Sequence, residues 1–345
     1  MKVAVLTGGG DCPGLNAVIR AIVRRSVAHG FEVMGLRDGW KGLIDDNHFR
    51  LTRETTSGIL HRGGTILGTS RVNPFKVENG LEKVMRTVER HGIGAVIAIG
   101  GEGTLSAAAQ MHKHGLKVVG IPKTIDNDLN CTDFTFGFDT AVMIATEAID
   151  RLHSTAESHK RVIVCEVMGR HAGWIATYSG IAGGADVILV PEHPVDLEKV
   201  AEHIRRRHST GRTFSIVVVA EGTLVKSDAQ GAEQIVSSGA LDEAGRVRLG
   251  GVGSFIAQEI ERRTGYETRV SVLGHIQRGG TPTAHDRVLA TRYGVHACDM
   301  VAKGEFGKMA ALRGNQIISA ELADATRELK TVDPAFFEVA QVFFG

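Results

Sequence analysis

The acidic loop at Pro122–Asp128 is the part of the sequence best suited to chemistry. It follows an apolar run and holds two carboxylates two positions apart, Asp126 and Asp128, together with Lys123 and Thr124. One carboxylate of this kind can accept a proton from an attacking hydroxyl while another helps to hold magnesium, as phosphoryl transfer requires. An Asx turn that caps the next element is the alternative, but a turn does not need all four side chains.

Two glycine-rich loops have the composition of phosphate sites. Gly8–Gly10 and Gly100–Thr104 each stand between a predicted strand and a predicted helix, where backbone N–H groups and the helix dipole favour an anion. The first loop has neither a Walker motif nor dinucleotide spacing, so a plain strand–helix turn is its alternative. The second contains Glu102, a carboxylate suited to magnesium beside phosphates. Its GGEG pattern also occurs in NAD kinases and diacylglycerol kinases, so it indicates a phosphoryl donor without selecting the acceptor.

Two further loops carry arginine. Met168–Trp174 contains Arg170, whose guanidinium can donate two hydrogen bonds to a phosphate. Leu273–Gly280 places His275 and Arg278 three positions apart, which suits a phosphate that is bound but not transferred. The alternatives are a helix N-terminus with a surface arginine in the first loop, and a hydrogen-bonded histidine with a solvated arginine in the second.

The spacing of the other polar residues argues against several classes of site. The 15 histidines include no H-E-x-x-H motif and no zinc-type pairing with cysteine, so they are predicted to have surface or packing roles. A G-x-S-x-G elbow is also missing, which leaves a serine hydrolase without support.

These loops require strands and helices to position them, and the pattern supplies both in alternation. Short apolar runs predict strands at Lys2–Thr7, Val96–Gly100, Val118–Pro122, Arg161–Met168, Asp186–Glu192 and Phe214–Gly222. Helical spacing predicts helices at Leu15–His29, Leu105–His114, Ile175–Gly180 and Leu197–His208. Buried strands alternating with amphipathic helices indicate an α/β fold with mainly parallel sheets covered on both faces. Ligands bind at the C-terminal ends of such strands, where the glycine and acidic clusters fall.

The chain is long enough for two domains of this kind. The best boundary lies near Gly137–Thr140, before a long helical stretch that reaches His153. Lys226–Arg248 is polar and rich in small residues, which predicts a loop or surface excursion. The aromatic end, Phe336–Phe344, predicts either a tail that docks on its own core or a contact with another subunit.

The composition excludes some classes of protein and indicates the cellular compartment. The chain has 345 residues with 43% apolar and 23% charged residues, and 40 basic against 39 acidic side chains, which excludes a polybasic nucleic-acid binder. Its four cysteines lie far apart, which argues against a disulfide framework and favours a reducing, cytoplasmic compartment. A signal peptide and a membrane-spanning run are not expected.

Taken together, the motifs resemble the 6-phosphofructokinase family, in particular the bacterial A type and its longer actinobacterial-like subgroup with ATP-using and pyrophosphate-using members. The segments that carry the resemblance are GGGDCPGLN, GGTILGTSR, GGEGT, PKTIDND, SHKR, EVMGRHAGW, AEG and LGHIQRGG, in the family's order over about the first 300 residues. The resemblance implies two Rossmann-like domains with the active site in the cleft between them. The donor domain would span 1–139 plus about 277–330, the fructose 6-phosphate domain 140–276, and a tail 331–345. Lys226–Arg248 is extra sequence relative to the shortest members.

The resemblance also implies the reaction and its residues. Asp126 would be the base for the 1-hydroxyl of fructose 6-phosphate, Thr124 and Asp128 would support it, and Arg71 and Arg170 would stabilise the transferred phosphoryl group. The donor would be bound by Gly10, Arg71, Val72, Gly101, Glu102, Gly103 and Thr104, and Mg²⁺ by Glu102 and Asp128. The sugar phosphate would be bound by Thr124, Ile125, Asp126, Met168, Gly169, Arg170, Glu221, His275 and Arg278.

Self-association follows from the same resemblance. Arg161 and Arg269 would reach a neighbouring subunit's sugar phosphate, so the protein is expected to be a dimer or a homotetramer. Residues aligned with the bacterial allosteric site are Arg20, Arg24, Arg53, Asp186 and Arg212, but His153 replaces an arginine there. The resemblance therefore predicts a weak or altered response to ADP and phosphoenolpyruvate.

The finest distinction within the family is between ATP and pyrophosphate as the phosphoryl donor. Many ATP-using members have aspartate at the position of Glu102, so the longer side chain here is expected to hold the metal through water. Glycine at the position of Gly103 leaves room for a nucleotide, whereas lysine at the position of Lys123 is typical of pyrophosphate users. An aspartate at position 103 would exclude ATP, whereas a lysine excludes neither donor, so ATP is the predicted donor and pyrophosphate the alternative. A catalytically silent sugar-phosphate sensor is the alternative of another class, although it has no need of Asp126, Arg71 or Arg170.

Overall fold

The computed structural model describes residues 1–226, 233–235, 237–241 and 247–344, and these fold as the α/β protein that the alternation predicts. The chain divides into two compact units. Unit 1 comprises Met1–Ile125, Leu129–Thr140 and Arg278–Leu329, and unit 2 comprises Asp126–Asp128, Ala141–Gln277 and Lys330–Gly345.

Unit 1 is built on a seven-stranded sheet with the order β15-β14-β5-β4-β1-β2-β3. The strands are β1 (Lys2–Thr7), β2 (Glu32–Leu36), β3 (His48–Leu51), β4 (Ile93–Gly100), β5 (Val118–Pro122), β14 (Lys308–Arg313) and β15 (Gln316–Glu321). The five inner strands are parallel to one another, and the edge strands β3 and β15 pair with them antiparallel. Because the inner strands are covered on both faces, β1 and β4 are apolar almost throughout.

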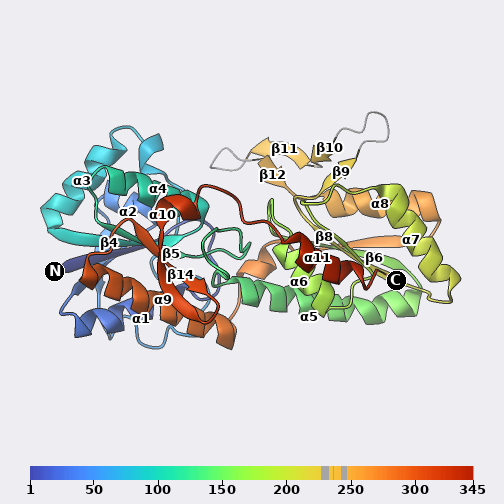
Figure 1. Ribbon diagram of the computed structural model, residues 1–345, viewed down its shortest axis with the longest axis horizontal. Coiled ribbons are helices and arrows are strands. Elements are labelled where there is room, and N and C mark those ends of the chain that lie inside the picture. Colours follow the sequence, from blue (N-terminus) through green and yellow to red (C-terminus); the bar gives the residue numbers. More distant parts are fainter. Residues whose placement is uncertain (227–232, 236, 242–246, 345) are drawn as a thin grey trace. The chain divides into compact units, whose positions relative to one another are not determined.

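Helices cover both faces of this sheet (Figure 1). Helices α1 (Leu15–Ala28) and α9 (Ala284–Lys303) pack together on one face. Helices α2 (Trp40–Ile44), α3 (Gly80–His91), α4 (Glu102–Lys113) and α10 (Leu322–Ala325) share a buried apolar cluster on the other, and a short 3₁₀ helix, η1, spans Pro74–Lys76.

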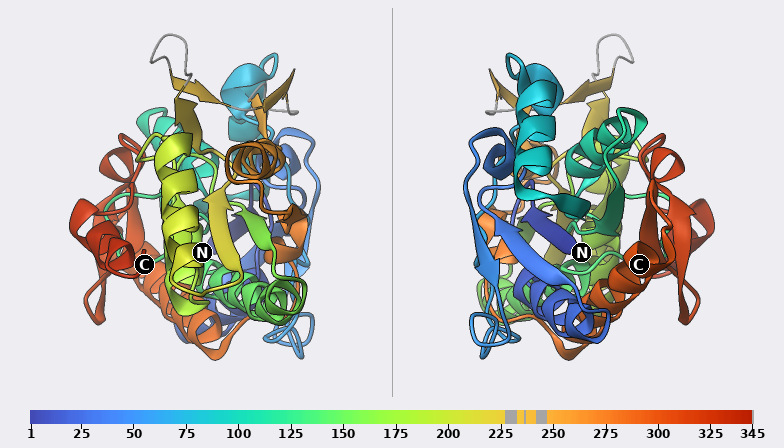
Figure 2. Two further views of the ribbon diagram at one scale, coloured as in Figure 1. Left: turned by 90° about the vertical axis from the view of Figure 1, so that its right-hand side faces the viewer. Right: turned by 90° about the vertical axis from the view of Figure 1, so that its left-hand side faces the viewer.

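Unit 2 contains a four-stranded parallel sheet with the order β13-β6-β8-β7. The strands are β6 (Val162–Val167), β7 (Val187–Leu189), β8 (Ser215–Ala220) and β13 (Thr268–Val272). Helices α7 (Leu197–Ser209) and α8 (Val252–Thr264) pack on one face, and α6 (Trp174–Ala182) packs on the other beside α5 (Phe138–His159), as Figures 1 and 2 show. A 3₁₀ helix, η2, spans Gly274–Arg278.

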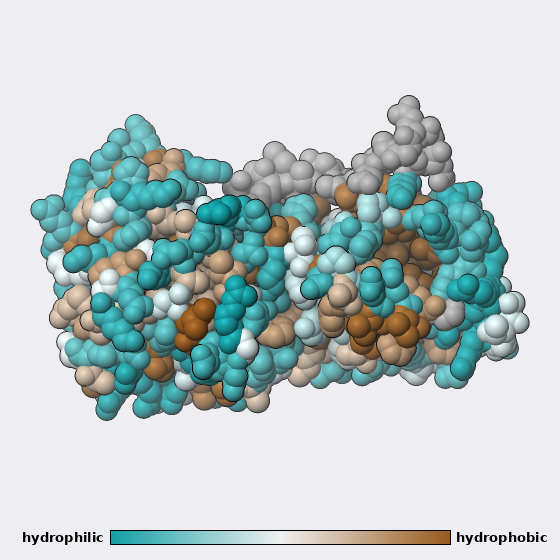
Figure 3. Space-filling view, in the orientation of Figure 1, coloured by the Kyte–Doolittle hydropathy of each residue, from teal (hydrophilic) through white to brown (hydrophobic). Residues whose placement is uncertain are grey.

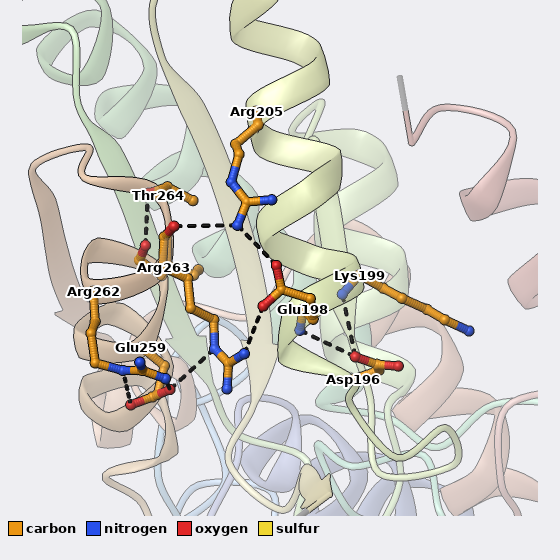
Figure 4. Close-up of polar contacts among 9 residues, drawn as sticks. Asp196, Glu198, Lys199, Arg205, Glu259, Arg262, Arg263 and Thr264 are labelled. Atoms are coloured by element: carbon orange, nitrogen blue, oxygen red, sulfur yellow. Dashed lines mark hydrogen bonds and ion pairs between the residues drawn. The ribbon is translucent and has the colours of Figure 1, made fainter. Parts of the chain in front are cut away.

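Ion pairs join α7 to α8 on the outer side of this layer (Figure 4). Glu198 of α7 accepts hydrogen bonds from Arg205 at 2.9 Å and from Arg263 of α8 at 2.8 Å. Arg263 also donates to Glu259 at 3.2 Å. Arg205 therefore lowers the pKa of the Glu198 carboxyl, with Arg263 adding to the effect.

The polar segment from Lys226 to Arg248 differs from the predicted loop where it is described. Strand β9 (Leu224–Lys226) pairs with β10 (Glu233–Ile235), and β11 (Ser237–Leu241) pairs with β12 (Val247–Leu249), both antiparallel. Short hairpin strands need only backbone hydrogen bonds and leave little apolar pattern, which explains why the sequence predicts a loop. The remaining positions of this segment lie outside the described residues.

The aromatic end of the chain docks within unit 2. Helix α11 (Pro334–Gln341) packs on α6, where the ring of Phe336 lies 6.3 Å from that of Trp174 and 4.9 Å from that of Tyr178. The indole N–H of Trp174 donates to the Lys330 carbonyl at 2.9 Å. Figure 3 shows apolar side chains gathered around this helix. Of the two predictions for this segment, the docked tail is the one that the structure shows.

Candidate active site

The loop after β1 lies between two cationic side chains of unit 1. The Lys123 ammonium donates a hydrogen bond to the carbonyl of Gly10. The Arg278 guanidinium donates to the carbonyl of Asp11 at 3.4 Å, and a side chain added at Gly10 would begin 2.6 Å from its Nη1 atom. Loop amides beside two cations have the chemistry to hold an anion.

A second segment, Gly63–Val72, is held against the same loop. The amide of Gly9 donates to the Ser70 carbonyl at 3.0 Å, and the Thr69 hydroxyl donates to the Gly9 carbonyl at 2.6 Å. The Asn16 side chain in α1 fixes the start of the segment, because its Oδ1 accepts from the Ile66 amide at 2.9 Å. Arg71 and Val72 thus follow directly after residues bonded to the glycine loop, and Arg71 is exposed.

The glycine loop after β4 lies against the loop after β1. The Gly8 amide donates to the Ile99 carbonyl at 2.9 Å, and the buried Thr104 packs where a side chain at Gly8 would stand, 2.5 Å from its Oγ1 atom. Only glycine permits this approach. Helix α4 begins at Glu102, directly after Gly101, so Glu102 and Gly103 are exposed in its first turn.

The acidic loop after β5 is almost entirely buried. Lys123, the first residue after β5, continues the sheet through an amide hydrogen bond to the Gly100 carbonyl at 3.0 Å. The carbonyl of Thr124 accepts from the Thr135 hydroxyl at 2.7 Å, and the Ile125 side chain is fully buried. Asp126 is only 5% exposed. Because β1, β4 and β5 are adjacent parallel strands, the loops after them leave the sheet at one edge.

In unit 2, a second set of predicted residues lies at the C-terminal ends of β6 and β8. The Glu221 carboxylate accepts from the Arg170 amide at 3.2 Å. Arg170 has a positive φ of 53°, and its carbonyl oxygen lies 1.7 Å from where a side chain at Gly222 would begin, so the turn requires glycine there. The Met168 amide, next to Gly169, donates to the Oε1 atom of buried Gln277 at 3.4 Å.

The 3₁₀ helix η2 carries the last two predicted ligands. His275 is exposed on it, and Arg278 ends it beside the glycine loop of unit 1. Gln277, between them in sequence, is the residue that the structure buries completely.

Arg161 and Arg269 lie at the opposite end of the unit 2 sheet from Met168 and Glu221. Arg161 precedes β6, and Arg269 is the second residue of the neighbouring strand β13. At about 3.3 Å per residue, β6 separates Arg161 from Met168 by about 20 Å. The Glu267 carboxylate pairs with both arginines and lies 2.7 Å from Arg161. The hydrogen bond from Arg161 is the main cause of the lowered pKa of the Glu267 carboxyl.

The residues aligned with an effector site are not all available to a ligand. Asp186 is buried, pairs with Arg207 at 2.9 Å and accepts from the Ile216 amide at 2.8 Å. His153 bonds the Gly183 carbonyl at 2.6 Å. Both side chains are therefore engaged in contacts within unit 2.

Three carboxylates that are not among the predicted site residues cap helix N-termini. Glu192 accepts from the Gly173 amide at 2.9 and 3.1 Å, so the N-terminus of α6 already holds an anion. Glu166 accepts from the Gly253 amide at 2.8 Å at the start of α8. Asp286 accepts from the amides of Gly137 and Thr140 at the start of α5. Each lies far in sequence from the helix it caps, so no local motif reveals it.

Adjacent phosphate-type loops, a buried aspartate and a parallel sheet define a phosphotransferase of the α/β class. The chain belongs to the phosphofructokinase family, because the family model described as Phosphofructokinase matches residues 2–301. This confirms the resemblance seen in the sequence.

Relatives of both donor types are similar over their full length. The chain is 58% identical over 346 residues to the pyrophosphate–fructose 6-phosphate 1-phosphotransferase of Amycolatopsis methanolica, covering 100% of both chains. It is 53% identical to the ATP-dependent 6-phosphofructokinase 3 of Streptomyces coelicolor, covering 99% of each. Among solved structures, phosphofructokinase from Saccharomyces cerevisiae matches with a TM-score of 0.82 and 32% identity over 99% of this chain and 46% of the yeast chain.

Within the described residues, no helix combines the length and the apolar character needed to cross a bilayer. The four cysteines carry free thiols. Burial raises the pKa of the Cys12 and Cys165 thiols to about 12, which makes both unreactive.

Proposed function

We propose that this protein transfers the terminal phosphoryl group of ATP to the 1-hydroxyl of fructose 6-phosphate, the committed step of glycolysis. One observation carries the proposal. Two glycine loops and the acidic loop follow the adjacent parallel strands β1, β4 and β5, so a phosphoryl donor and a proton acceptor share one edge of a sheet.

Asp126 is the proposed base. Its carboxylate accepts the proton of the 1-hydroxyl as that oxygen forms a bond to the terminal phosphorus, and the bond to the leaving ADP oxygen breaks. Burial of the loop fixes the position of Asp126, and Thr124 supports it. Arg71 and Arg170 stabilise the charge on the phosphoryl oxygens.

The residues near the loops suit magnesium. Glu102 and Asp128 offer carboxylate oxygens, which are the ligands that Mg²⁺ prefers, and Glu102 is exposed in the first turn of α4. When bound, the ion would offset the negative charge of the donor phosphates.

The sugar phosphate is assigned to Met168, Gly169, Glu221, His275 and Arg278. Arg161 and Arg269 are assigned to the site of a neighbouring subunit, because about 20 Å of strand separates Arg161 from Met168 in the same chain. The proposal therefore includes self-association as a dimer or tetramer. The free thiols fit a cytoplasmic enzyme.

Two features of the glycine loops make ATP the proposed donor. Gly103 is exposed at the start of α4 and adds no side chain that would repel an α-phosphate. The Lys123 ammonium is already bonded to the Gly10 carbonyl, so its charge helps to hold the loop in place with either donor.

Pyrophosphate is the second candidate, and a separate observation favours it. Relatives named as pyrophosphate-dependent reach 58% identity, and Lys123 is the residue type that the family resemblance links to that donor. With that donor the same residues would run a readily reversible reaction.

Product analysis tests the reaction itself. Purified protein with Mg²⁺, fructose 6-phosphate and ATP should yield a sugar with a second phosphate on carbon 1, identified by phosphorus and proton NMR. Glucose 6-phosphate serves as the control acceptor. Absence of the bisphosphate with both ATP and pyrophosphate, while fructose 6-phosphate still binds, would favour a silent sensor instead.

A further inference from the structure

Three metal-binding side chains converge on the outer edge of unit 1, away from the loops assigned to catalysis. The Nε2 atoms of His48 and His91 lie 3.2 Å apart. The Oδ1 atom of Asp46 lies 2.6 Å from Nε2 of His91 and 3.4 Å from Nε2 of His48. Asp46, His48 and His91 are the one such group of three found among the described residues.

The three atoms have the separations of ligands around a small metal ion. In a tetrahedral zinc site with bonds of about 2.1 Å, neighbouring ligand atoms lie about 3.4 Å apart. Two of the three separations are 3.2 and 3.4 Å, and only the contact between Asp46 and His91 must lengthen, by less than 1 Å. Two imidazoles and one carboxylate are a donor set of transition-metal sites.

Hydrogen bonding alone satisfies this cluster poorly. Nε2 of His91 faces both Nε2 of His48 and Oδ1 of Asp46, yet a neutral ring nitrogen either donates or accepts. A single proton on Nε2 of His91 can serve only one of these two neighbours well, whereas a metal ion would use the lone pairs of all three atoms.

The neighbouring groups orient the ligands. Arg90 donates to Oδ2 of Asp46 at 2.8 Å, which leaves Oδ1 directed at the histidines. The Lys2 ammonium donates to the His91 carbonyl at 2.7 Å and fixes the end of α3. Such outer contacts commonly hold ligating side chains in position.

Exposure leaves room for a further ligand. The side chains of Asp46, His48 and His91 are 27%, 23% and 24% exposed, so the cluster is open to water on one side. An ion there would join the turn after α2, the edge strand β3 and the C-terminal end of α3.

We propose that Asp46, His48 and His91 bind a divalent transition-metal ion, Zn²⁺ in the first instance, as a structural link at the edge of the unit 1 sheet. The proposal is independent of the proposed activity, because none of the three residues is assigned to donor, sugar or Mg²⁺.

Calorimetric titration of untagged, chelator-treated protein with Zn²⁺ in the presence of excess Mg²⁺ tests the site. One ion should bind per chain, and His48→Gln and His91→Gln should each weaken binding by about tenfold or more. His159→Gln, an exposed histidine at the end of α5, is the matched control and should bind like the wild type. Asp46→Asn should weaken binding while the exposed neighbour variant Asp45→Asn should not.

Co²⁺ provides a readout that does not depend on stability. Wild-type protein should give the visible absorption of a four- or five-coordinate ion, and His48→Gln, checked for native circular dichroism, should lose it. No tight Zn²⁺ binding to the wild type, or equal binding to wild type and His48→Gln, would overturn the proposal and leave the cluster as a network of hydrogen bonds.

Discussion

At the scale of single residues, the proposed reaction depends on a few side chains that are held in place in different ways. Asp126 is fixed by burial of its loop, Lys123 by a hydrogen bond to the Gly10 carbonyl, and Arg71 by its position after Ser70, which bonds the glycine loop. The proposed base, anion ligand and transition-state cation thus have different structural supports.

Replacement of the proposed base tests its role. Asp126→Asn keeps the size of the side chain but cannot accept the hydroxyl proton, so kcat should fall about 10²- to 10⁴-fold. The affinity for fructose 6-phosphate, measured by calorimetry, should change little. A variant that binds the sugar poorly but retains kcat would assign Asp126 to binding instead.

Replacement of Lys123 tests its role in holding the glycine loop. Lys123→Met removes a charged hydrogen bond to the Gly10 carbonyl, worth about 1.5–3 kcal/mol, so kcat/KM should fall about tenfold or more with either donor. Lys117→Met, an exposed lysine before β5, is the control. A loss confined to pyrophosphate would contradict this role and would assign Lys123 to recognition of that donor.

At the scale of elements, the sequence predicts the strands and helices that carry the predicted site loops. β1 and β5 have the bounds that the apolar runs predict, and α4 begins three residues earlier than predicted because Glu102–Thr104 already form its first turn. The edge strands β3 and β15 are not predicted, since their mixed exposure weakens the apolar signal, and the short inner strand β2 is not predicted either.

The capping carboxylates show what a single sequence cannot supply. Asp286 lies almost 150 residues from the amides that it caps, and Glu192 lies 19 residues from Gly173. Such pairs form only when the fold brings them together. The same holds for the cluster of Asp46, His48 and His91, because His91 lies 43 residues after His48 in the chain.

Glu192 should hold both α6 and the C-terminal segment. It accepts from Gly173 and, at 2.9 Å, from the amide of Val332. Glu192→Ala should therefore lower stability by about 1–2 kcal/mol and speed hydrogen exchange at both amides. Glu338→Ala, on the exposed side of α11, should do neither. Unchanged exchange at Val332 in the Glu192 variant would contradict this link.

Asp286 should make stability depend on pH. Burial raises the pKa of its carboxyl to about 6, against hydrogen bonds from Thr140 and Gly137 that favour ionisation. Since this exceeds the unfolded value of about 3.9, the stabilising contribution of the protonated form is lost as pH rises from about 4 to about 6. Urea unfolding should be measured at pH 5 and pH 7. The free energy of unfolding of Asp286→Asn, relative to that of the wild type, should be roughly 1 kcal/mol higher at pH 7 than at pH 5. A widening wild-type advantage would refute the assignment.

At the scale of the whole molecule, the chain consists of two units, each with its own parallel sheet and its own set of predicted ligands. Unit 1 contains the glycine loops, and unit 2 contains Asp126, Met168 and Glu221. The proposed reaction assigns ligands to each unit, and Arg161 and Arg269 stand at the opposite end of the unit 2 sheet from Met168 and Glu221.

Mixed oligomers test the shared site. Arg161→Ala/Arg269→Ala chains and Asp126→Asn chains should each be nearly inactive alone. After mixing and reassembly, half of the dimers are mixed, and one of their two sites combines an intact base with intact arginines, so about a quarter of wild-type activity should return. Failure to recover activity, with mixed oligomers shown by native mass spectrometry, would place the arginines in their own chain's site or outside catalysis.

The most direct test of the central claim is a comparison of kcat/KM for ATP and for pyrophosphate, with saturating fructose 6-phosphate and Mg²⁺, in one preparation of the wild-type protein. The proposed function predicts that fructose 1,6-bisphosphate forms and that kcat/KM is about tenfold or more higher for ATP than for pyrophosphate. The reason is that Gly103 has no side chain that would repel the nucleotide. Activity with pyrophosphate alone would contradict it and would make Lys123 the residue that decides the donor.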